Sequence, residues 1–229
     1  MKEALIGMLL LSMTLPAQQS GAAWTNIGPS PAAVQAIAVD PHGTGTVFIG
    51  SVAAGVKKSI DGGTTWSAVN NGLTTPIASA LAIDASGPQT VYAGNNGGLF
   101  KTDDGGTTWR RLPSITNSVA SIATDPKRPG VVYVEAFNNL SNGAIRKSTD
   151  GGATWTTFPT PAAVFKITID PEEPDTLYLP TIGHGAFKST DGGQNWSSMS
   201  GLSAAAIWTI AIDPADSRVL YAGTNEDGV

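Results

Sequence analysis

The chain has 229 residues, no cysteine and a formal net charge of −5. Without cysteine it can form neither a disulfide framework nor a thiol nucleophile. The acidic balance, with no basic stripe, argues against nucleic acid or an anionic membrane surface as a partner.

The first 23 residues resemble a secretory signal peptide. A single Lys2 precedes an apolar stretch from Ala4 to Leu15, and small or polar residues follow it. This pattern predicts cleavage after Ala23, or alternatively after Ala17. We therefore expect a secreted protein, extracellular or periplasmic, with no membrane insertion once the signal peptide is removed.

From residue 33 onward, one pattern of four short β-rich runs recurs about every forty residues. The runs are separated by Gly, Pro, Asn and Asp, which predicts strands and turns, and no window has a sustained helical period. Complete repeats are predicted at 33–69, 77–112, 119–158 and 164–199, with a partial fifth at 206–229. Residues 24–28 predict an isolated outer closing strand. Four strands in such a period are typical of a β-propeller blade. The predicted fold is thus an all-β propeller with four complete blades and a partial fifth.

An Asp-Gly-Gly turn followed by Trp marks each complete repeat. The turn aspartates are separated by 43, 46 and 41 residues: Asp61, Asp104, Asp150 and Asp191. The tryptophans are Trp66, Trp109, Trp155 and Trp196. An Asp carboxylate can accept backbone N–H groups in a tight turn, and Trp supplies a large apolar body to place between sheets. Because four equivalent aspartates would imply four equivalent active sites, their repetition favours a structural role.

This phrase resembles the Asp-box, or BNR repeat, and the resemblance covers Trp24 to Val229. It places the chain near secreted bacterial propellers related to xyloglucan-cleaving glycoside hydrolases, sialidases, and sortilin-type or photosystem-assembly propellers. In that family the Asp-box lies between the third and fourth strands, away from the ligand-binding face. The resemblance also implies a larger ring, of about seven blades, of which this chain is a fragment. The alternative is a five-bladed ring with a defective last blade.

Two departures from the repeat indicate where a ligand could bind. Glu135 occupies a position held elsewhere by Gly50, Gly94, Pro180 and Gly223. It begins a long loop that contains Asn138 and Asn139, and His184 lies in the equivalent loop of the next repeat. On the face opposite the Asp-boxes, these side chains are candidate ligand contacts.

The second departure lies on the innermost strands, five residues before each strand-ending Asp. This position is predicted to open onto the central channel, and its residues are Gln35, Ser79, Ala120, Phe165 and Trp208. The aromatic rings of Phe165 and Trp208 beside amides and carboxylates would suit a sugar. The alternative is that Trp208 plugs the channel, and this is favoured because side chains usually fill propeller interiors.

The sequence contains no complete catalytic set. Glycosidases mostly need two carboxyl groups across the scissile bond, and the weak candidates are Glu135, Glu226 and Asp227. No cofactor is indicated, and no metal site, since His42 and His184 are predicted at opposite rims. We expect a non-catalytic binding or scaffold module for a glycan or a protein, with a polysaccharide or an extracellular protein as partner. The alternative is a fragment of a xyloglucanase-like glycoside hydrolase whose carboxylate pair is incomplete here.

Overall fold

The computed structural model describes residues 28, 33–136, 143–181, 183–201 and 206–224, and every regular element among them is a β-strand. The predicted signal peptide lies outside these residues, as does the predicted outer strand apart from Gly28. Four antiparallel four-stranded sheets and one two-stranded sheet are present. The first contains β1 (Val34–Val39), β2 (Val47–Ser51), β3 (Val56–Ser59) and β4 (Ser67–Ala68). The second contains β5 (Ala80–Ile83), β6 (Val91–Asn95), β7 (Gly98–Thr102) and β8 (Arg110–Arg111).

The remaining sheets repeat the same strand order. The third contains β9 (Val119–Thr124), β10 (Val132–Ala136), β11 (Ala144–Ser148) and β12 (Thr156–Pro159). The fourth contains β13 (Thr168–Ile169), β14 (Leu177–Pro180), β15 (Ala186–Ser189) and β16 (Ser197–Ser198). The fifth contains β17 (Ile207–Ile212) and β18 (Leu220–Thr224).

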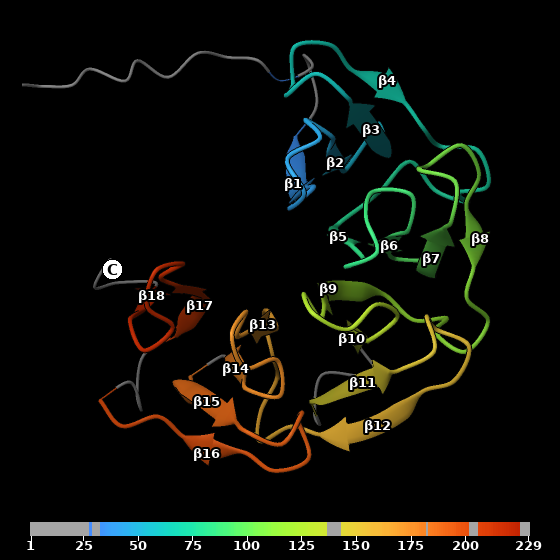
Figure 1. Cartoon of the computed structure of the whole chain (residues 1–229). Helices are drawn as coiled ribbons and strands as arrows, with labels where there is room; N and C mark the ends of the chain where they lie inside the picture. Colours follow the sequence, from blue (N-terminus) through green and yellow to red (C-terminus); the bar gives the residue numbers. More distant parts are fainter. Residues whose placement is uncertain (1–27, 29–32, 137–142, 182, 202–205, 225–229) are drawn as a thin grey trace, which may run out of the picture.

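The five sheets follow one another around an open arc, as Figure 1 shows. In each sheet the first strand lies toward the centre of the arc and the last available strand lies farther out (Figure 1). The prediction of an all-β propeller with four complete blades and a partial fifth is therefore confirmed. The total blade number of seven, and the five-bladed alternative, stay predictions.

Buried apolar clusters hold each sheet against the next. Side chains from the first and second sheets form one cluster, and the other clusters lie between the later pairs of sheets. Trp109 is only 5% exposed and packs among residues of the first sheet, where its Nε1 donates a 2.8 Å hydrogen bond to the Val69 carbonyl. Trp155 and Trp196 are partly buried and pack against the next two clusters. Burial of both faces of a sheet in this manner is what makes the stack stable.

A lysine on the third strand of each complete sheet adds a second link. Its ammonium group lies 5.1 to 5.6 Å from an aromatic ring of the second strand: Lys58 over Phe48, Lys101 over Tyr92, Lys147 over Tyr133 and Lys188 over Tyr178. Lys58 also donates a 3.0 Å hydrogen bond to the carbonyl of Gly105, in the Asp-Gly-Gly turn of the next sheet. The favourable charge–quadrupole contact thus lies where two sheets meet.

The four Asp-Gly-Gly turns share one hydrogen-bond pattern. Asp104 accepts the Thr108 backbone N–H at 2.8 Å and the Thr108 hydroxyl at 2.6 Å, and Thr102 donates its hydroxyl to Asp104 at 2.7 Å. These hydrogen bonds, led by that from Thr108, lower the pKa of Asp104 from 3.8 to about 2. The turn aspartates Asp61, Asp150 and Asp191 have the same pKa. All four carboxylates are therefore engaged inside their turns.

Replacement of Trp109 by alanine is predicted to destabilise the stack. Loss of a buried tryptophan should lower the free energy of unfolding by about 3 to 5 kcal/mol, because this side chain packs between two sheets. Urea unfolding followed by tryptophan fluorescence and circular dichroism measures the change. Trp66→Ala is the matched control, since Trp66 is only half-buried and belongs to none of the clusters. Equal losses in the two variants would contradict the role assigned to Trp109.

Thr108→Val should raise the pKa of Asp104 from about 2 toward 3.8, because it removes the hydroxyl donor at unchanged volume. Carboxyl chemical shifts followed by NMR titration give the value, and Asp61 and Asp150 in the same protein should stay at about 2. The sign for stability follows from the lowered pKa. Above pH 3.8, the usual pKa of an aspartate, the ionised turn carboxylates stabilise the folded protein. This stabilisation is lost as the pH falls toward about 2. An unchanged Asp104 titration in the variant would show that Thr108 does not hold the carboxylate.

Candidate functional site at the channel mouth

One hollow, with a volume of about 340 Å³, lies where the innermost strands begin. Its wall includes the five residues at one repeat position of five successive sheets: Gln35, Ser79, Ala120, Phe165 and Trp208. The Asp-Gly-Gly turns lie at the other edge of the sheets, since the Gly62 and Gly105 N–H groups donate to Gly45 and Gln89 in the loops that follow the innermost strands. We call this hollow the channel mouth.

A stacked aromatic pair forms one side of the channel mouth. The ring centroids of Phe165 and Trp208 are 4.2 Å apart and their planes differ by 29°. Trp208 remains 49% exposed and both residues line the hollow, so the pair offers aromatic surface there. Such a pair has a defined orientation before any ligand arrives.

Glu135 is not at the surface of a loop, as the sequence suggested, but is 3% exposed near the end of β10. It pairs with Ser121 of β9 and with Ile145 of β11. Tyr133, two residues earlier on the same side of the strand, packs in the cluster between the third and fourth sheets. The Glu135 carboxyl therefore lies between these two sheets.

The neighbouring sheets explain why the first two repeats carry glycine at this position. A Cβ on Gly94 would lie 2.6 Å from Val119 Cγ1 of the next innermost strand, and one on Gly50 would collide with the Ala78 carbonyl. In the fourth sheet the innermost strand β13 has only two residues, whereas β9 and β17 have six. Before β13, Val164 still forms an antiparallel bridge with Thr181 and the Phe165 N–H donates to the Pro180 carbonyl at 3.1 Å. The pairing then breaks, and the Ile167 N–H donates a 3.0 Å hydrogen bond to the Ser121 hydroxyl of the third sheet instead. This interruption coincides with the space that Glu135 occupies.

Burial controls the chemistry of Glu135. Its Oε2 has no hydrogen-bond partner in the structure, and desolvation raises the pKa of the carboxyl from 4.5 to about 7. A carboxyl in this state can donate a proton near neutral pH, which is the property of a general acid.

The other predicted contacts divide into two groups. His184 is exposed on the loop between β14 and β15, at the edge of the sheets where β10 ends. It does not share the buried environment of Glu135. Four predicted residues lie outside the described part of the chain: Asn138, Asn139, Glu226 and Asp227.

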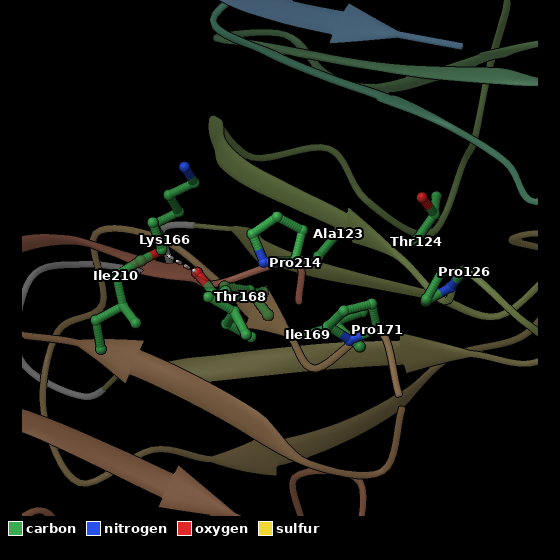
Figure 2. Close-up of a pocket in the computed structure, with 12 residues that line it drawn as sticks. Ala123, Thr124, Pro126, Lys166, Thr168, Ile169, Pro171, Ile210 and Pro214 are labelled. Atoms are coloured by element: carbon green, nitrogen blue, oxygen red, sulfur yellow. Dashed lines mark hydrogen bonds between the residues drawn. The ribbon is translucent and has the colours of Figure 1, made fainter. Parts of the chain in front are cut away.

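Sequence reasoning missed Lys166, although a signal was present. Lys166 occupies the position four residues before the strand-ending Asp, which holds small residues in the other repeats: Ala36, Ala80, Ser121 and Thr209. Lys166 lines the channel mouth and also a second hollow of about 450 Å³ on the turn side of the channel. Figure 2 shows this second hollow, where the Lys166 side chain points away from the rings of Pro126 and Pro171.

The described residues contain no group of three His, Asp or Glu side chains that could hold a metal ion. Within the same ranges no helix is long and apolar enough to cross a membrane. The predicted absence of a metal or cofactor stays a prediction.

No protein-family model matches this chain, and no curated protein matches it. Solved structures do match, and they are β-propellers. An ancestral GH74 enzyme is 25% identical with a TM-score of 0.75, and the match covers 87% of this chain and 28% of that one. The GH74 xyloglucanase from Xanthomonas campestris is 16% identical with a TM-score of 0.67, covering 84% and 34%.

YCF48 bound to a D1 peptide is 17% identical with a TM-score of 0.65, covering 87% of this chain and 64% of that one. The chain thus spans about a third or less of the two GH74 structures. These similarities support the β-propeller fold of this chain.

Glu135→Gln should change how stability depends on pH. Because burial raises the folded-state pKa of this carboxyl, the protein loses stability as the pH rises from 4.5 to about 7. The loss is complete above that value. The shift corresponds to about 3 kcal/mol. The variant should therefore be more stable than the parent above pH 7 and show a flatter profile below it.

Urea unfolding at a series of pH values measures this profile. Glu172→Gln serves as the control, because Glu172 is exposed on the turn side of the fourth sheet. An identical pH profile for the parent and Glu135→Gln would contradict the buried, unpartnered carboxyl.

Proposed function

We propose that this chain is a carbohydrate-binding β-propeller module that binds a glycan at the channel mouth, on the edge opposite the Asp-Gly-Gly turns. The observation that carries the proposal is the stacked pair of Phe165 and Trp208 in a hollow bordered by five sheets. Sugar rings present flat C–H faces that pack on aromatic rings, and their hydroxyl groups need polar partners nearby. The amide of Gln35 and the ammonium group of Lys166 supply such partners.

The module is proposed to bind without cleaving. Glycosidases mostly use two carboxyl groups about 5 to 9.5 Å apart, and the residues that line the channel mouth include no Asp or Glu. The proposal includes export of the protein, which residues 1–23 predict. An extracellular protein is the other partner class that the sequence leaves open.

A second candidate function is glycoside hydrolysis, as in the GH74 enzymes with a similar fold. The specific observation in its favour is Glu135, whose pKa of about 7 suits a general acid. Under this proposal the second carboxylate would come from residues outside the described part of the chain. Release of reducing ends that is abolished by Glu135→Gln would establish this function in place of simple binding.

Trp208→Ala should weaken glycan binding at least tenfold, because a half-exposed aromatic ring at the centre of a site commonly carries much of the binding energy. Affinity electrophoresis against a panel of polysaccharides, followed by calorimetry with the best binder, measures the loss. The matched control is Tyr221→Ala, since Tyr221 is 50% exposed on the same sheet but does not line the channel mouth. Binding of no polysaccharide by the parent, or equal binding by the two variants, would refute the proposed site.

A further inference from the structure

The charge of the channel mouth differs from that of the whole chain. The chain carries a net charge of −5, yet neither this hollow nor the one on the turn side is lined by Asp or Glu. Lys166 is the charged residue that lines both. Most of the acidic side chains lie on the turn side, in the Asp-Gly-Gly turns and in the loops after the innermost strands.

Lys166 is exposed, and no carboxylate of the described residues forms an ion pair with its ammonium group. Within the described ranges it has no ion pair, whereas other lysines are paired, Lys101 with Asp103 and Lys127 with Glu172. Glu135 is the acidic residue that pairs with Ser121 of the hollow wall. That carboxyl is 3% exposed, and burial disfavours its charged form. A positive group thus faces the channel mouth without a competing negative one.

The aromatic pair and the lysine occupy adjacent positions in the chain. Phe165 precedes Lys166 directly, and Phe165 stacks on Trp208 at 4.2 Å. All three residues line the channel mouth, so a sugar that rests on the aromatic pair has the Lys166 ammonium group within reach of its substituents. Backbone groups are available too, because β9 and β17 are the inner edge strands of their sheets.

We propose that the ligand of the channel mouth is an acidic glycan, whose sugar carboxylate pairs with Lys166 while its ring packs on Phe165 and Trp208. This inference rests on the proposed function and specifies the chemical class of the ligand. The carboxylate would gain a charge-assisted hydrogen bond in a region whose wall carries no acidic side chain.

The test compares an oligogalacturonide with its fully methyl-esterified form, which has the same backbone without the charge. Calorimetry below pH 7, with the whole chain, should show the free acid binding more tightly. Lys166→Gln should remove this preference by weakening the free acid about two- to fivefold, the value of an exposed ion pair. It should weaken the methyl ester less than the free acid, because the ester offers no carboxylate for a charge-assisted hydrogen bond. Lys127→Gln, which removes a lysine on the turn side, should retain the preference, and circular dichroism should show that both variants are folded.

The outcomes separate the two proposals. Equal binding of the acid and the ester by the parent overturns the acidic ligand but leaves glycan binding intact. Failure of both oligosaccharides together with every polysaccharide of the panel overturns the proposed function itself. Oligoglutamate that binds as tightly as the oligogalacturonide, with the same dependence on Lys166, overturns the inference because the site would then recognise charge and not sugar. Binding of the free acid should also weaken as salt is added.

Discussion

Each sheet of this propeller carries apolar side chains on both faces, and these faces are buried by contact with the neighbouring sheets. This contact is the constraint on which the rest of the structure depends. Trp109, Trp155 and Trp196 lie at these contacts, as does the Lys58 ammonium group. Where the described arc has no neighbouring sheet, apolar side chains remain in water, as Ile37 at 64% and Val39 at 62% exposure show for β1. The inner strands acquire their positions from this stacking, so the channel mouth is built by the interfaces and not by any one sheet.

The close stacking of the sheets also restricts which side chains fit near the channel mouth. Gly50 and Gly94 lie against the next sheet, so a Cβ would collide with the Ala78 carbonyl at Gly50 and with the Val119 side chain at Gly94. Glu135 is accommodated because the fourth innermost strand is interrupted before β13. Phe165 and Lys166 line the hollow, as do the residues at the same two repeat positions of the first three sheets. The interruption in strand pairing therefore accounts for the buried carboxyl, and the repeat itself accounts for the place of the two residues of the candidate site.

The sequence predicted the fold well and the site only in part. Turn and core positions recur in each repeat, so the period alone predicts sheets, strand order and the place of the turns. The five positions around the channel mouth could be found in the same way, by comparison at one repeat position. The burial of Glu135 could not, because residues 164–167 have an ordinary strand pattern and only their pairing shows the gap. Lys166 was missed although the same comparison singles it out among small residues.

The repeat explains the fold, but the residues that all blades share give little information about the chemistry of the site. Features shared by all blades, such as the turn aspartates with a pKa of about 2, are used up by local hydrogen bonds and are poor proton donors or acceptors near neutral pH. Chemistry must come from what the blades do not share, and these differences gather between the third and fifth sheets. Phe165, Lys166 and Trp208 provide aromatic surface and a positive charge at the channel mouth, and the proposed recognition of a sugar rests on these features. Glycosidases mostly use a second carboxyl group opposite the first, and the residues that line the channel mouth include no Asp or Glu. This difference is the reason why the proposal is binding and not cleavage.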